Sequence, residues 1–353
     1  FAVEGVWKRD DWNSRVIFPV ASAVQAAMFR SFGTGLVPAR RLTALIATAS
    51  LVLFALLAYE ASGPVVAVMA LAFLGFDPVF LFLSRTANPA PMGIFLMMAT
   101  IAFWRLSVTK LWIAPIAGMF LILASIVENA PHDLFFAVTA LLATLMVRLQ
   151  AWKMPWSGRV RLRVHLFWVA AAMTLLAWAA LLAWPMRDDF ARMLDTPLGS
   201  LRPGSVPINL FLAPFILGRL VYWMPLIIAI ALVYVLVFAR SLLAPIARHR
   251  PLSETRVWFF AWLVTAPLFM AVRADRPLGT LVLLSPPICF AAAEALVALL
   301  RIREVKKPDL DVLVVLGLLM IVVWTVVQGV VHVAVLPWSE SLPSSFFEHQ
   351  FRH

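Results

Sequence analysis

Residues 226 to 238 read Leu-Ile-Ile-Ala-Ile-Ala-Leu-Val-Tyr-Val-Leu-Val-Phe, without one charged side chain. The run is apolar on every side, so it has neither the alternation of a half-buried strand nor the single stripe of a soluble helix. Inside a bilayer there is no water, and backbone N–H and C=O groups must bond within their own segment. The stretch therefore predicts a helix that crosses a membrane.

The composition extends this prediction to the whole chain. Of the 353 residues, 63% are hydrophobic and 13% are charged, and the mean hydropathy is +0.93. A soluble domain carries roughly a quarter charged residues, so a water-soluble globular protein is excluded. The net charge of +11 comes from Lys and Arg beside apolar runs, which indicates anionic lipid and membrane topology and not nucleic acid. The single cysteine, Cys289, excludes an internal disulfide.

A spanning helix needs about 20 apolar residues, and ten runs meet this requirement. We therefore predict an all-α polytopic integral membrane protein with about ten transmembrane helices. The runs begin near Leu42, Pro64, Pro91, Trp112, Pro131, Val164, Arg219, Val257, Gly279 and Leu310.

Lys and Arg in short connections predict the orientation, because they are enriched on the cytoplasmic side. Every second connection is basic and otherwise bland, and we assign these connections to the cytoplasm: Arg105, Lys110, Arg148, Lys153, Arg159, Arg161, Arg163, Arg240, Arg248, Arg250, Arg256, Arg301, Arg303, Lys306 and Lys307. The intervening connections hold fewer positive charges and many of the acids, and we assign them to the outer face. Chemistry is therefore expected at the outer face.

The chain divides into three predicted parts: residues 1–41, the remnant of a first outer loop; residues 42–336, a transmembrane helical domain; and residues 337–353, an outer interfacial tail. In the first part, Pro19 opens an amphipathic helix that carries apolar side chains on one side and ends at Gly33. Such a helix lies on a membrane surface. We expect the true start of the protein upstream of Phe1.

Three stretches share the layout of a known class. The first stretch, Ile17 to Leu42, contains a helix that a proline opens and a Phe-Gly pair ends, followed by an Ala-Arg-x-Leu element. The second, Phe82 to Pro89, reads Phe-Leu-Ser-Arg-Thr-Ala-Asn-Pro. The third, Arg276 to Ala292, leads into a late predicted span. In this order and spacing they resemble the GT-C class of polytopic glycosyltransferases, the group of protein mannosyltransferases, aminoarabinose transferases and rhizobial lipopolysaccharide transferases. The resemblance extends over nearly the whole chain.

The resemblance implies an inverting transfer of a sugar from a polyprenyl-phosphate-linked donor to a lipid, glycan or protein acceptor. It places the protein in a bacterial inner membrane with its active face periplasmic or extracellular. The chemistry requires a carboxylate base for the acceptor hydroxyl, and cationic groups or a metal for the phosphate leaving group. No cofactor is certain, and a divalent cation is the candidate that this chemistry leaves open.

The resemblance places the base carboxylate at or before Phe1, and within the chain Glu4 and Asp11 are the catalytic candidates; the alternative is that both are solvated loop charges. For the donor phosphate the candidates are the outer cations Arg85, His132, Arg273 and Arg276, which we predict to converge on one outward cavity. The alternative for Arg85 is an arginine that snorkels from a helix end, and for His132 an ordinary helix N-terminus. Where many members carry an acid after the arginine of the turn, this sequence has Asn88 and Ala90.

Further polar and aromatic residues receive structural interpretations. We interpret Asp77, which precedes Pro78 in an apolar run, as satisfying local donors at a helix end; the alternative is a functional carboxylate inside the membrane. Beside Arg187 and Arg192, three acids are interpreted as members of solvated ion pairs, with an acceptor surface as the alternative: Asp188, Asp189 and Asp195. Five aromatic residues are interpreted as interfacial anchors: Trp104, Trp112, Trp184, Tyr222 and Trp223.

Two other functions stay open. A catalytically inactive relative acting as a lipid-binding subunit would fit Asn88 and Ala90. A lipid or polyol transporter would instead carry charges in the middle of its spans and paired half-repeats.

Overall fold

The computed structural model describes residues 17–127, 135–151, 157–191, 253–272 and 282–304, with Val323 and Val327. Throughout these ranges every regular element is helical. Two helices, Leu36–Ser62 and Gly158–Ala191, are long and apolar enough to cross a membrane, and the pair Pro64–Gly75 and Val79–Arg85, bent by 63°, would make a third. The all-α membrane fold agrees with the sequence, whereas ten spans stay a prediction.

The helices follow the predicted apolar runs. The run near Arg219 lies outside the described residues, as does the run near Leu310 apart from Val323 and Val327, and each of the others overlaps a helix. In chain order the structure contains α2 (Pro19–Phe32), α3 (Leu36–Ser62), α4 (Pro64–Gly75), α5 (Pro78–Arg85), α6 (Ala90–Leu106), α7 (Ala114–Ser125), α8 (Phe135–Ala151), α9 (Ser157–Trp178), α13 (Glu254–Val272) and α15 (Ser285–Glu304).

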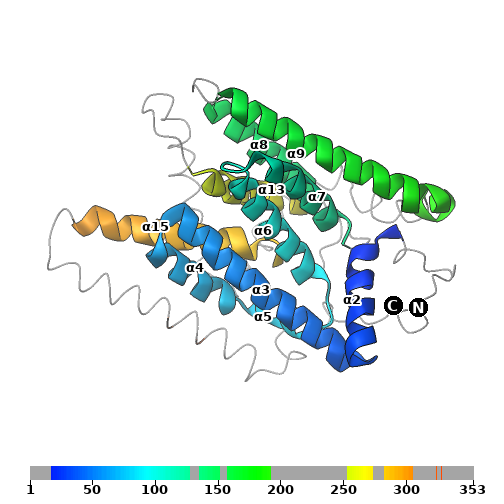
Figure 1. The fold of residues 1–353 in the computed structure, drawn as a ribbon. Coiled ribbons are helices and arrows are strands. Elements are labelled where there is room, and N and C mark those ends of the chain that lie inside the picture. The colour runs from blue at the N-terminus through cyan, green and yellow to red at the C-terminus, as the bar shows by residue number, and fades with distance from the viewer. Residues whose placement is uncertain are drawn as a thin grey trace.

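The predicted interfacial helix is α2, with the bounds that Pro19 and Gly33 indicate. It stands crosswise to α3, which begins beside it (Figure 1). Gly33 and Gly35 make the turn between the two helices with φ of 82° and 148°, values that favour glycine. Helix α3 begins at Leu36, inside the predicted loop part, and Pro38 lies in its first turn, where a proline is tolerated.

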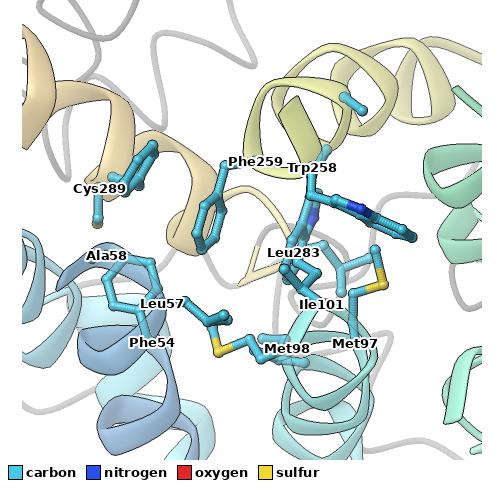
Figure 2. Close-up of a cluster of buried hydrophobic side chains, with 14 of the residues drawn as sticks. Phe54, Leu57, Ala58, Met97, Met98, Ile101, Trp258, Phe259, Leu283 and Cys289 are labelled. Carbon is cyan, nitrogen blue, oxygen red and sulfur yellow. The ribbon is translucent and has the colours of Figure 1, made fainter. Parts of the chain in front are cut away.

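The core lies where α3, α6, α13 and α15 meet. Figure 2 shows side chains of these helices packed together, with Phe54 on α3 facing Phe259 on α13. These two rings pack edge to face with centroids 5.7 Å apart, and Phe259 stacks on Phe290 of α15 at 4.5 Å. Helix α6 lies between α3 and α7 (Figure 1) and buries most of its surface.

The outer surfaces of two long helices are apolar. Helix α3 exposes Leu45, Val52 and Leu56, and α9 exposes Val169 and Met173 along one face. A soluble protein rarely leaves apolar patches of this extent in water. These faces suit lipid.

Candidate functional site

The start of α2 lies beside the ends of α7 and α9. The Trp178 indole, at the end of α9, donates to the carbonyl oxygen of Ile17 at 2.6 Å. The backbone N–H of Ala21 donates to the carbonyl oxygen of Val127, after α7, at 3.2 Å. The segment that enters α2 therefore lies beside the point from which the connection holding His132 departs.

Arg85, the described member of the predicted phosphate set, is the last residue of α5 and is exposed. Its neighbours fix the turn: the Ser84 hydroxyl donates to the Leu81 carbonyl oxygen at 2.7 Å, and the Thr86 hydroxyl donates to that of Leu83 at 3.1 Å. The guanidinium is thus presented at a defined helix end.

The Asn88 side chain has a clear local role. Its Oδ1 accepts a hydrogen bond from the Ala90 backbone N–H at 2.9 Å, at the first turn of α6. An aspartate could make the same bond, because both side chains offer an oxygen to a helix start. Asn88 therefore keeps the turn without supplying a carboxylate.

The other predicted site residues, Glu4, Asp11, His132, Arg273 and Arg276, lie outside the described residues. Their convergence with Arg85 stays a prediction. In the part of the chain that the structure describes, no three His, Cys, Asp or Glu side chains are grouped so as to hold a metal ion. The divalent cation likewise stays a prediction.

The opposite end of the helices carries a network of ion pairs. Arg105 Nε lies 2.5 Å from Glu60 Oε1, and Thr255 donates to the other oxygen of the same carboxylate. Arg256 Nε lies 2.6 Å from Glu294 Oε1. These contacts join α3, α6, α13 and α15 through acids that lie on the helices, which the charge count of the connections did not include.

The most buried pair of this network joins α9 to α13. Arg163, which is 3% exposed, places Nη2 2.5 Å from both carboxylate oxygens of Glu254. The guanidinium carbon lies 4.4 Å from the ring centroid of Trp104, whose Nε1 donates to Glu254 at 2.8 Å. Trp104 is fully buried, so its interpretation as an interfacial anchor is wrong, whereas Trp112 and Trp184 are exposed as an anchor must be.

Sequence reasoning missed the acids of this network because charge counting treats each arginine as a free charge. Glu60 and Glu254 each lie at or near the end of an apolar helix, and Glu294 lies midway along α15. A carboxylate in such a place is costly unless it is paired. That cost is the signal that could have assigned these acids to the basic ends of neighbouring spans.

Two structural interpretations are confirmed. Asp77 Oδ1 accepts from the Val79 backbone N–H at 3.0 Å and caps α5, as expected for a carboxylate that satisfies local donors. Arg187 and Asp188 form an exposed ion pair at 3.8 Å.

The fold is similar to that of solved membrane proteins. The chain superposes on a structure of ArnT from Cupriavidus metallidurans, a GT-C aminoarabinose transferase, that holds undecaprenyl phosphate. The TM-score is 0.62 and the sequence identity is 16%, and the match covers 98% of this chain and 61% of the ArnT chain. It superposes on the apo state of the same protein with a TM-score of 0.58 and 16% identity, over 94% of this chain and 57% of that one. No family model and no curated protein matches the sequence.

The chain thus has the fold of these ArnT structures. It spans about three fifths of the length of the ArnT structures.

Proposed function

We propose that the protein is a membrane glycosyltransferase that transfers a sugar from a polyprenyl-phosphate-linked donor to a lipid, glycan or protein acceptor, with inversion at the reacting carbon. The observation that carries the proposal is the similarity over nearly the whole chain to a structure that holds undecaprenyl phosphate. We place the protein in a bacterial inner membrane, with the start of α2 at the outer face. The large apolar faces of α3 and α9 support the membrane setting.

In this proposal the outer cations bind the donor phosphate. Arg85 supports the role because it is exposed at a helix end whose turn is fixed by hydrogen bonds. A guanidinium can bind a phosphate through two parallel hydrogen bonds. His132, Arg273 and Arg276 complete the proposed set, and Glu4 or Asp11 supplies a base.

The first test is binding of undecaprenyl phosphate to the whole chain in lipid nanodiscs, measured by native mass spectrometry. Arg85→Ala should weaken binding about tenfold, because one charge-assisted contact contributes about 1.5 kcal/mol or more. Arg187→Ala, which removes an exposed arginine paired with Asp188, is the matched control and should leave the affinity for undecaprenyl phosphate unchanged. Equal affinity of both variants would remove Arg85 from the site, and no binding by the parent protein would refute the donor class.

A catalytically inactive relative is the second candidate, and Asn88, whose side chain accepts a hydrogen bond at the start of α6, favours it because this turn supplies no acid. The two candidates differ in turnover. Undecaprenyl-phosphate-linked hexoses and pentoses, incubated with the protein and bacterial envelopes, should release undecaprenyl phosphate if the protein is a transferase. Binding of undecaprenyl phosphate without such release from any donor would favour the lipid-binding subunit.

A further inference from the structure

The chain turns sharply at Asp77, between α4 and α5, whose axes are bent by 63°. The backbone N–H of Asp77 donates to the Leu74 carbonyl oxygen of α4 at 3.2 Å. Its carbonyl oxygen accepts from the Leu81 N–H of α5 at 2.9 Å, and its Oδ1 accepts from the Val79 N–H at 3.0 Å. One residue therefore ends α4 and begins α5.

The Asp77 side chain is enclosed by the core. It is 1% exposed, and Ser285, the first residue of α15, lies beside its carboxylate. Its Oδ2 is buried and meets no hydrogen-bond partner among the described residues. The side chain thus acts on α5 through Oδ1 and the Val79 N–H. An asparagine oxygen could accept the same bond.

Helix α5 rests on the core through one apolar face. Val79, Phe80 and Leu83 are buried, whereas Arg85 at the end of the helix is exposed. Apolar burial has no preferred direction, whereas a hydrogen bond constrains both distance and angle. Packing therefore determines which face of α5 points inward, and the bond to Asp77 determines where its first turn begins and how the helix is tilted.

The tilt of α5 decides where Arg85 lies. The helix has eight residues, which makes it about 12 Å long at a rise of 1.5 Å per residue. A change in tilt of about 10° at its start would therefore move its end by about 2 Å. Hydrogen bonds from N–H to oxygen span only about 2.7–3.2 Å, so a displacement of this size would break a contact with a phosphate.

We propose that Asp77 is a positioning residue, which sets the tilt of α5 through Val79 and so places Arg85 for the donor phosphate. The inference rests on the proposed function, because it takes Arg85 as a phosphate ligand. Asp77 is buried and does not touch the donor. Its acceptor oxygen, and not its charge, performs the role, so Asp77→Asn should behave as the parent does, whereas Asp77→Gly and Asp77→Ala should not.

The first test is a spin-label distance measurement on the whole chain in a Cys289→Ala background, which removes the one native cysteine. Labels are attached to cysteines at Ala87, exposed just after α5, and at Tyr59, which is 59% exposed near the end of α3. The background protein and its Asp77→Asn variant should share one narrow distance distribution. Asp77→Gly should broaden or shift it, and should still fold because glycine at a helix start costs little. Asp77→Ala is the second variant without an acceptor and should act alike.

The second test is the affinity of the unlabelled variants for undecaprenyl phosphate in nanodiscs. Asp77→Gly should weaken binding about tenfold, as Arg85→Ala does, and Asp77→Asn should not. Asp77→Gly combined with Arg85→Ala should bind as Arg85→Ala alone does, because both changes remove the same contact. Asp188→Ala, which removes an exposed carboxylate, is the matched control and should leave distance and affinity unchanged.

The outcomes separate the role of Asp77 from the proposed function. An unchanged distance in Asp77→Gly and Asp77→Ala would overturn the inference, as would an Asp77→Asn variant that differs from the parent as much as Asp77→Gly does. Parent-like affinity in Asp77→Gly, or additive losses in its combination with Arg85→Ala, would also overturn it. If the parent binds no undecaprenyl phosphate but the distances respond as expected, the proposed function fails and the control of α5 by Asp77 stands.

Discussion

Removal of the Glu254 charge should destabilise the protein strongly. Glu254→Gln keeps an oxygen that accepts from Trp104 Nε1, but it leaves the Arg163 guanidinium buried without a counter-charge. Breaking a buried ion pair on one side costs about 3–5 kcal/mol. The Glu254 side chain is 16% exposed, and Arg163 keeps its contact with the Trp104 ring, so the loss should lie at the lower end of this range. We expect the free energy of unfolding to fall by about 3 kcal/mol, which changes the unfolding equilibrium constant about a hundredfold.

The chain offers a natural reporter for this measurement. Cys289 is the only cysteine and is fully buried on α15. A thiol-reactive fluorophore therefore reports unfolding during titration with a denaturing detergent. The matched control is Asp188→Asn, the same kind of change in an exposed ion pair at 3.8 Å. It should leave the transition in place, because exposed pairs contribute little.

A double variant distinguishes loss of pairing from loss of shape. Arg163→Met combined with Glu254→Gln removes both charges, and it should recover most of the stability that Glu254→Gln loses. The reasoning is refuted if the double variant is no more stable than Glu254→Gln, or if Asp188→Asn costs as much.

Three further changes test the packing, the topology and the start of α6. Gly118→Ala should disrupt the contact of α7 with α9, because the added Cβ would lie 2.1 Å from a backbone oxygen of α9. Gly158→Ala is the control: its Cβ would meet no atom within 4 Å, so the melting temperature of the protein should fall in Gly118→Ala and not in Gly158→Ala. Cysteines placed at Ser157 and Ser205 should react with an impermeant reagent from opposite sides, Ser205 from outside, and labelling of both from one side would contradict the predicted orientation. Asn88→Asp should keep the stability of the parent in the same unfolding assay, whereas Asn88→Ala should lose about 1 kcal/mol with the hydrogen bond to the Ala90 N–H.

The sequence by itself determined the helices. Long apolar runs cannot leave backbone groups unpaired in lipid, so α3, α6 and α9 follow from composition alone. The bounds of α2 follow from Pro19 and Gly33, which act within one turn. The cap by Asp77 was equally readable, because its acceptor oxygen and its donor are two residues apart. The candidate site was readable only in part, since Arg85 is described and its predicted partners lie outside the described residues.

Only the tertiary structure decided which helix ends meet. Thr255 and Glu60 lie 195 residues apart, and Trp178 and Ile17 lie 161 apart. Apolar faces of similar helices fit many neighbours, since lipid and protein interiors are alike in polarity. A charge or an indole N–H finds its partner only after the helices have packed, because the cost of leaving it unpaired depends on what lies within hydrogen-bond distance.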